Sequence, residues 1–172
     1  MIDRNSFVGN AGPERRAALV RAAAIGTVAS VAVHGALAYF GRRAGRSAIA
    51  PINATSHIVH GPDAGALDRI DVPHTVVGAT INHGASIFWA LPLAWWLTKD
   101  RHLSAADICM GAAATGAIAG AVDYGLVPRR LSPGWHHALP AKSVAGSFGA
   151  LAAGLAAGAL LLRFAEARRT TA

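Results

Sequence analysis

Four long apolar stretches constrain what this chain can fold into. They cover about residues 22–40, 75–97, 105–127 and 143–162. A helix needs about 20 mostly apolar residues to cross a bilayer, and a spanning segment must pair its own backbone amides. Stretches of this length are too long for the strands of a membrane barrel. We therefore expect an all-α polytopic membrane protein, a bundle of four transmembrane helices.

The composition agrees with a membrane location. Hydrophobic residues make up 53% of the 172 residues and charged residues only 15%, which is unusual for a soluble domain. A net charge of +7 raises nucleic-acid binding as an alternative, but the arginines sit in pairs beside the apolar stretches, as at Arg42 and Arg43 or Arg129 and Arg130. This arrangement predicts contact with lipid headgroups, and no nucleic-acid partner is expected.

The apolar stretches also suggest how the chain is organised. We expect one transmembrane domain over residues 22–164, an N-terminal tail of residues 1–21 and a C-terminal tail of residues 165–172. In the long first connection, an apolar piece at residues 51–60 begins with Pro51 and stops before Gly61, which predicts a short interfacial helix.

The distribution of Lys and Arg suggests an orientation. An even number of spans places both termini on one side, where we count nine Lys and Arg, against seven in the other two loops. This difference favours cytoplasmic termini in a cell inner membrane.

Small residues recur every four positions on the predicted spans. The fourth span carries Gly146, Ala150, Gly154 and Gly158 on one face. Because small residues let helix backbones approach each other in lipid, such a face is expected to pack on another helix. That helix could belong to the same chain, to a second copy in a homodimer, or to a partner membrane protein.

Ionisable residues concentrate in the half of the bundle next to the first connection. At 1.5 Å per residue, His34 and His83 lie about 9 and 12 Å from that surface, and Asp123 about 6 Å from it. Five more histidines fall in the loops and helix ends above: His57, His60, His74, His136 and His137. A buried ionisable group in a membrane helix is costly and therefore indicates a functional site.

Three chemistries fit these residues. A transition metal could be bound by His34, His83 and Asp123, with the five outer histidines at the entrance or as further ligands. A haem b could be held by His34 and His83 as axial ligands. A proton or small ion could pass along the same side chains. Taken singly, each residue is also explained by a hydrogen bond between helices.

The sequence contains no motif that points to an enzyme. It has no HExxH helix, nucleophile elbow, Walker loop, dinucleotide fingerprint or CxxC pair. We therefore expect a non-enzymatic membrane protein that binds a metal ion or haem, or moves a small ion, through the histidine and aspartate side chains. The alternative is an accessory subunit that docks on a partner through its small-residue faces.

Overall fold

Four long helices dominate the computed structural model, which describes residues 11–100 and 102–170. They are α1 (Ala11–Arg43), α4 (Val72–Lys99), α5 (Ala105–Gly125) and α6 (Ala141–Thr170), and each is long and apolar enough to span a membrane. Five short helical segments lie between them: α2 (Ala50–Thr55), α3 (His57–His60), η1 (Pro62–Ala66), η2 (Arg129–Leu131) and η3 (Trp135–His137). The predicted all-helical bundle is confirmed, and it indicates a multi-pass membrane protein.

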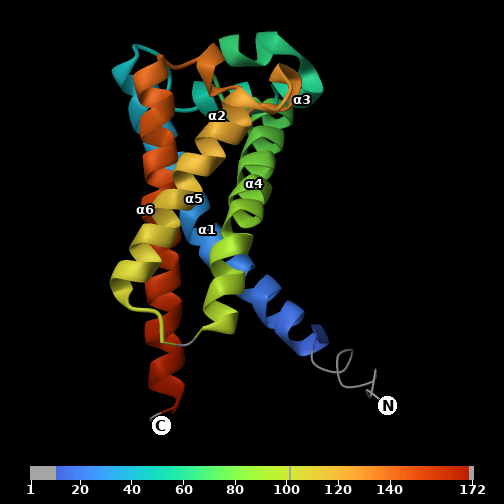
Figure 1. Cartoon of the computed structure of the whole chain (residues 1–172). Coiled ribbons are helices and arrows are strands. Elements are labelled where there is room, and N and C mark those ends of the chain that lie inside the picture. Colours follow the sequence, from blue (N-terminus) through green and yellow to red (C-terminus); the bar gives the residue numbers. More distant parts are fainter. Residues whose placement is uncertain (1–10, 101, 171–172) are drawn as a thin grey trace.

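The helices extend beyond the expected spans. Residues 11–21, assigned to an N-terminal tail, continue α1, and α6 runs through Thr170 into the expected C-terminal tail. Residues 1–10, Arg101 and residues 171–172 lie outside the described residues. At 1.5 Å per residue α1 is about 50 Å long, longer than the hydrocarbon core is thick. Its oblique course across the bundle is visible in Figure 1.

Polar side chains define where two of the spans begin. Ser104 accepts from the backbone N–H of Asp107, and the Asp107 carboxylate accepts in return from the backbone N–H of Ser104, which forms a capping box at the start of α5. Asp71 caps α4 by accepting from the backbone N–H of His74.

The helices of the bundle approach each other at small residues. A Cβ atom on Gly154 would lie 2.6 Å from the Cα of Ala29, and one on Gly158 would lie 3.0 Å from the Cα of Ile25. The small-residue face of α6 therefore packs on α1 of the same chain. In the same way, a Cβ on Gly26 of α1 would lie 2.5 Å from the Cα of a residue in α4.

Residues 44–71 and 126–140 together form a compact layer over one end of the bundle, which we call the cap (Figure 1). Every residue of α2 is buried. A Cβ atom on Gly78 of α4 would lie 2.1 Å from the carbonyl oxygen of Ile52, so α2 rests directly on α4. The predicted short helix at residues 51–60 is present, as α2 and α3, and α2 belongs to the protein core.

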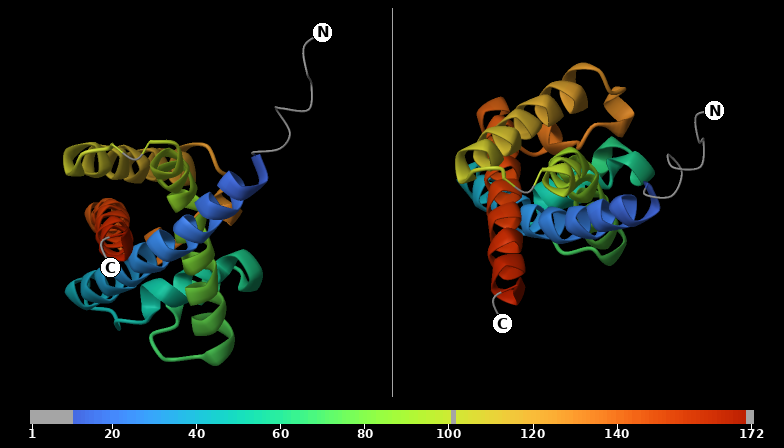
Figure 2. Two further views of the ribbon diagram at one scale, coloured as in Figure 1. Left: turned by 90° about the horizontal axis from the view of Figure 1, so that it is seen from below. Right: turned by 60° about the horizontal axis from the view of Figure 1, so that its bottom comes forward.

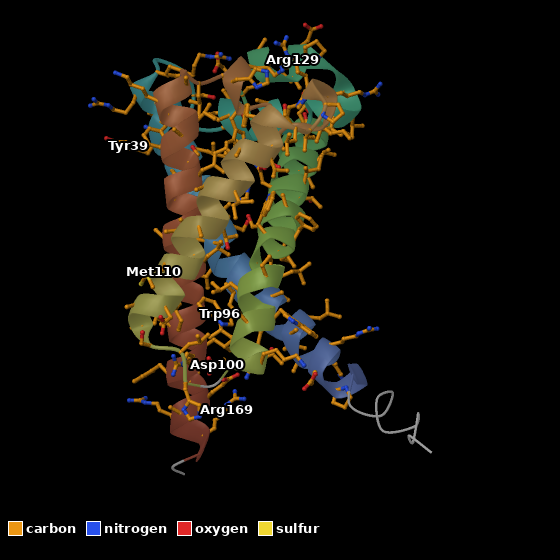
Figure 3. The ribbon with its side chains drawn as sticks, in the orientation of Figure 1. Tyr39, Trp96, Asp100, Met110, Arg129 and Arg169 are labelled. Atoms are coloured by element: carbon orange, nitrogen blue, oxygen red, sulfur yellow. The ribbon has the colours of Figure 1, made fainter. Side chains whose placement is uncertain are left out.

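The outer surface of the bundle is apolar. Large side chains that are more than half exposed include Leu19, Val31, Tyr39, Met110 and Ile118. Figure 3 marks Tyr39 and Met110 on this surface, between Arg129 at the cap and Arg169 near the other end. An apolar belt bounded by charged ends is what a bilayer requires.

Candidate functional site

A small cavity lies directly beneath the cap, between α4 and α5. Its volume is about 80 Å³. Apolar side chains from α1, α4, α6 and the cap form much of the wall, and six polar or indole side chains complete it: Thr55, Asn82, Ser86, Trp89, Asp123 and Trp135. This space holds a few water molecules or a small ion, and it is far below the size of a pocket for a drug-sized ligand.

A hydrogen-bond relay fixes the orientation of Asn82 in the cavity wall. The indole N–H of Trp135 donates to the Thr55 hydroxyl oxygen over 3.1 Å, and the Thr55 hydroxyl donates to Oδ1 of Asn82 over 3.3 Å. Because Oδ1 is the acceptor, the amide nitrogen Nδ2 must lie on the other side. Nδ2 is buried without a hydrogen-bond partner, and Asn82 is only 4% exposed. Asn82, one of the residues that line the cavity, therefore carries a buried, unpaired donor.

Among the described residues, Asp123 contributes the only acidic side chain of the cavity wall. The Trp89 side chain lies close to its carboxylate. Within the described part of the chain no ion pair involves Asp123, although Arg129 and Arg130 follow it closely in sequence. A carboxylate without a basic partner leaves the cavity with an uncompensated acceptor.

His34 and His83 lie outside this cavity wall. Nδ1 of His34 is 2.7 Å from the carbonyl oxygen of Ser30, which places the proton on Nδ1 and the lone pair on Nε2. Nε2 is buried and has no hydrogen-bond partner. His83 is half-buried, and no hydrogen bond or ring contact joins it to His34 among residues 11–100 and 102–170.

Three histidines of the cap lie in a row. The ring centroids of His57 and His137 are 5.2 Å apart, and those of His137 and His136 are 4.1 Å apart. The two ring nitrogens of His57 lie 3.0 Å from the carbonyl oxygen of Ala54 and 3.3 Å from that of Arg129. His57 thereby links the two halves of the cap.

Desolvation and neighbouring charge affect the outer members of this row. The pKa of His136 lies below its ordinary value. The largest cause is desolvation against the cap, and smaller ones are the nearby charges of His137, His57 and Arg129. Desolvation and then His57 lower the pKa of His137. Both side chains are therefore neutral at pH 7.

Apart from this row, a pair of histidines lies at the start of α4. The rings of His60 and His74 are 4.3 Å apart, and Nδ1 of His74 is 3.1 Å from Oδ1 of Asp71. The close approach of the His74 side chain is the largest of the effects that lower the pKa of Asp71. This contact steadies the first turn of α4.

The predicted ligands thus fall into separate groups. Asp123 lines the cavity, and the cap histidines form one row and one pair. No three His, Cys, Asp or Glu side chains in the described ranges are grouped so that they could hold a metal ion. The cavity is also too small for a haem, and neither His34 nor His83 lines it.

The sequence analysis missed most of the polar side chains around Asp123. Asn82 and Ser86 lie four residues apart on α4, a helical spacing that places two polar residues on one face of a span. Thr55 and Trp135 come from the cap, and their position under it follows from packing between segments 80 residues apart.

Searches with the sequence and with the structure found no matching family model, no matching curated protein and no matching solved structure. The function therefore has to be argued from the site itself.

Proposed function

We propose that this protein is a non-enzymatic membrane protein that binds a small cation in the cavity beneath the cap. Asp123 supplies the negative charge. Asn82 Nδ2 donates to the oxygen of a water molecule that stays on the ion. The observation that carries the proposal is that one cavity is lined both by an uncompensated carboxylate and by a residue with a buried, unpaired amide donor.

The chemistry of the cavity wall supports a hydrated ion over a bare one. A dehydrated cation would lie against the N–H groups of Asn82, which repel positive charge. An ion that keeps part of its water shell satisfies both groups, because its positive charge neutralises Asp123 and the oxygen of a bound water accepts from Asn82. A cavity of about 80 Å³ has room for such a cluster.

Equilibrium dialysis of the detergent-purified protein tests this proposal. The probes are Na⁺, K⁺, Mg²⁺ and Mn²⁺, each alone, and the bound metal is measured by elemental analysis. We expect one saturable equivalent of one of these ions, lost in Asp123→Asn and weakened in Asn82→Ala. Asp63→Asn, which changes an exposed carboxylate in η1, is the matched control. Equal binding by Asp123→Asn, or no saturable binding by the unchanged protein, would refute the proposal.

His34 supports a second candidate, the binding of a transition metal or haem iron. A metal-binding histidine usually donates its second N–H to a carbonyl or carboxylate, as His34 does to Ser30. Metal analysis and an optical spectrum of the purified protein, compared with a His34→Ala, His83→Ala double variant, separate the two candidates. A metal or Soret band that the double variant loses favours His34, and binding lost only in Asp123→Asn favours the cavity.

The accessory-subunit alternative needs a surface other than the glycine face of α6. Gly154 and Gly158 are covered by α1 of the same chain. A homodimer or a partner membrane protein would have to bind one of the lipid-facing surfaces. Copurification of a stoichiometric partner without any bound ion would favour this alternative.

We also propose an orientation with cytoplasmic termini in a cell inner membrane. The support is the excess of Lys and Arg at the end of the bundle where α1 begins and α6 ends. A C-terminal alkaline phosphatase fusion should be inactive, and a C-terminal green fluorescent protein fusion should be fluorescent. The opposite result would place the cap in the cytoplasm.

A further inference from the structure

A groove opens between α1 and α6 at the end of the bundle opposite the cap. The first turns of α1 and the last turns of α6 spread apart there, as both views of Figure 2 show. The groove has a volume of about 730 Å³. Its closed end is the ion pair between Arg21 and Glu166, in which the guanidinium nitrogen and the carboxylate oxygen are 3.0 Å apart.

Two arginines on opposite sides of this groove are available to a ligand. Arg16 on α1 and Arg169 on α6 both line it and are exposed. Neither has a hydrogen bond or an ion pair within residues 11–100 and 102–170. Arg21, in contrast, is occupied, because it also donates to the carbonyl oxygen of Leu97 and to the Thr98 hydroxyl.

The acidic side chains at this end are already engaged. Glu14 pairs with Lys99, Glu166 pairs with Arg21, Asp100 accepts from the backbone N–H of His102, and Asp107 belongs to the capping box of α5. The described part of the chain therefore offers no acid to balance the charges of Arg16 and Arg169. An external anion would supply that balance.

Apolar surface lies next to these charges. Val20 on α1 lines the groove and is 64% exposed, and Leu162 and Ala165 on α6 line it as well. The Lys99 ammonium lies 5.0 Å from the ring centroid of Trp95, an aromatic and cationic pair typical of the headgroup layer. The groove thus places cations at headgroup depth and apolar walls toward the hydrocarbon.

We propose that this groove binds one anionic phospholipid, with its phosphate between Arg16 and Arg169 and its acyl chains along the apolar side chains of the groove wall. A phosphate accepts hydrogen bonds from two guanidinium groups at once. A soluble anion would leave the apolar walls uncovered, whereas a lipid covers both parts of the groove. The occupied groove would also fill the space between the two helices, and so fix the angle at which they diverge.

Native mass spectrometry with a mixture of two lipids tests the proposal. The protein is incubated with equal amounts of phosphatidylglycerol and phosphatidylcholine that carry the same acyl chains. We expect one phosphatidylglycerol to be retained in preference to phosphatidylcholine by about tenfold. Arg16→Gln, Arg169→Gln should abolish the preference. The control is Arg42→Gln, Arg43→Gln, which removes two exposed arginines from the other end of α1 and should leave the preference intact.

Three results would overturn the proposal. One is a lack of selection by the two groove arginines. It would be seen as equal retention of the two lipids by the unchanged protein, or as an equal loss of preference in both double variants. Another is displacement of the bound species by inorganic phosphate alone, since that would indicate an ion site without lipid. The third is a dimer that the Arg16, Arg169 variant loses, since that would make a second copy the occupant.

Discussion

The indole N–H of Trp135 donates to the hydroxyl oxygen of Thr55, 80 residues earlier in the chain, and both side chains are buried. This contact joins the two halves of the cap at the roof of the cavity. The Thr55 hydroxyl in turn donates a hydrogen bond to the side-chain carbonyl oxygen of Asn82. The cap is therefore part of the folded core, and the arrangement of the cavity depends on it.

Replacing Thr55 with valine should destabilise the protein by about 2–3 kcal/mol. The change keeps the volume of the side chain but leaves the Trp135 N–H and the Asn82 carbonyl without partners in a buried place. The free energy of unfolding can be measured by titration with sodium dodecyl sulfate. The matched control is Thr27→Val, which removes a hydroxyl bonded only to the carbonyl of Ala23 on the exposed side of α1. Equal effects of the two changes would show that the relay adds no stability.

Gly134→Ala should cost more than Gly45→Ala, and the difference isolates one contact. Both glycines have a positive φ, 74° and 73°, so both changes introduce backbone strain of about 1 kcal/mol. A Cβ atom on Gly134 would also lie 2.4 Å from Nδ1 of His57, whereas nothing lies within 4 Å of one on Gly45. We expect about 2 kcal/mol of further destabilisation at Gly134, measured by thermal unfolding in detergent. Similar melting temperatures would contradict close packing of His57 under η3.

Gly154→Ala should destabilise the bundle by about 1–3 kcal/mol, because the added methyl group forces α6 away from Ala29. Gly149→Ala is the control, since a Cβ there meets nothing within 4 Å and alanine favours the helix. Unfolding in detergent micelles measures both. If Gly154→Ala instead left stability unchanged and altered an oligomeric state, the α1–α6 packing within one chain would be refuted.

Much of the fold could be predicted because the bilayer imposes simple rules on spanning helices. Apolar runs of the right length predicted the four spans, and Pro51 with Gly61 predicted the short helical piece in the first connection. The helix ends were less predictable. Residues 11–21 contain three arginines, which made a helix inside the membrane hard to extend, and the bonds of Arg21 to Leu97 and Glu166 join segments far apart in the sequence.

The candidate site was only partly accessible from sequence. Depth counting on single helices placed Asp123 near the cap, because depth follows from helical rise alone. It could not say which side chains surround Asp123, since these come from different elements and depend on how the cap folds over the bundle. Trp135 is only 4% exposed, and its burial depends on packing between the two halves of the cap.

Acidification should lower the free energy of unfolding through His136 and His137 at a higher pH than through the carboxylates. The pKa values of His136 and His137 are lowered in the folded protein from an ordinary value of 6.5. Below that pH the unfolded chain binds protons more readily than the folded one, so the free energy of unfolding falls as the pH decreases from about 6.5 toward the folded pKa values. Asp68 and Asp71, whose pKa values are lowered from 3.8, stabilise the fold above that value and lose their contribution only in stronger acid.

Thermal stability measured at intervals from about pH 8 to about pH 5 tests this expectation. The unchanged protein should lose stability over the lower half of that range, and His136→Gln, His137→Gln should flatten the curve, because glutamine does not titrate. His102→Gln, which changes an exposed histidine at the opposite end of the bundle, should leave the curve as it is. A slope that survives in the double variant would contradict this expectation, because the pH dependence would then arise outside the His136 and His137 pair.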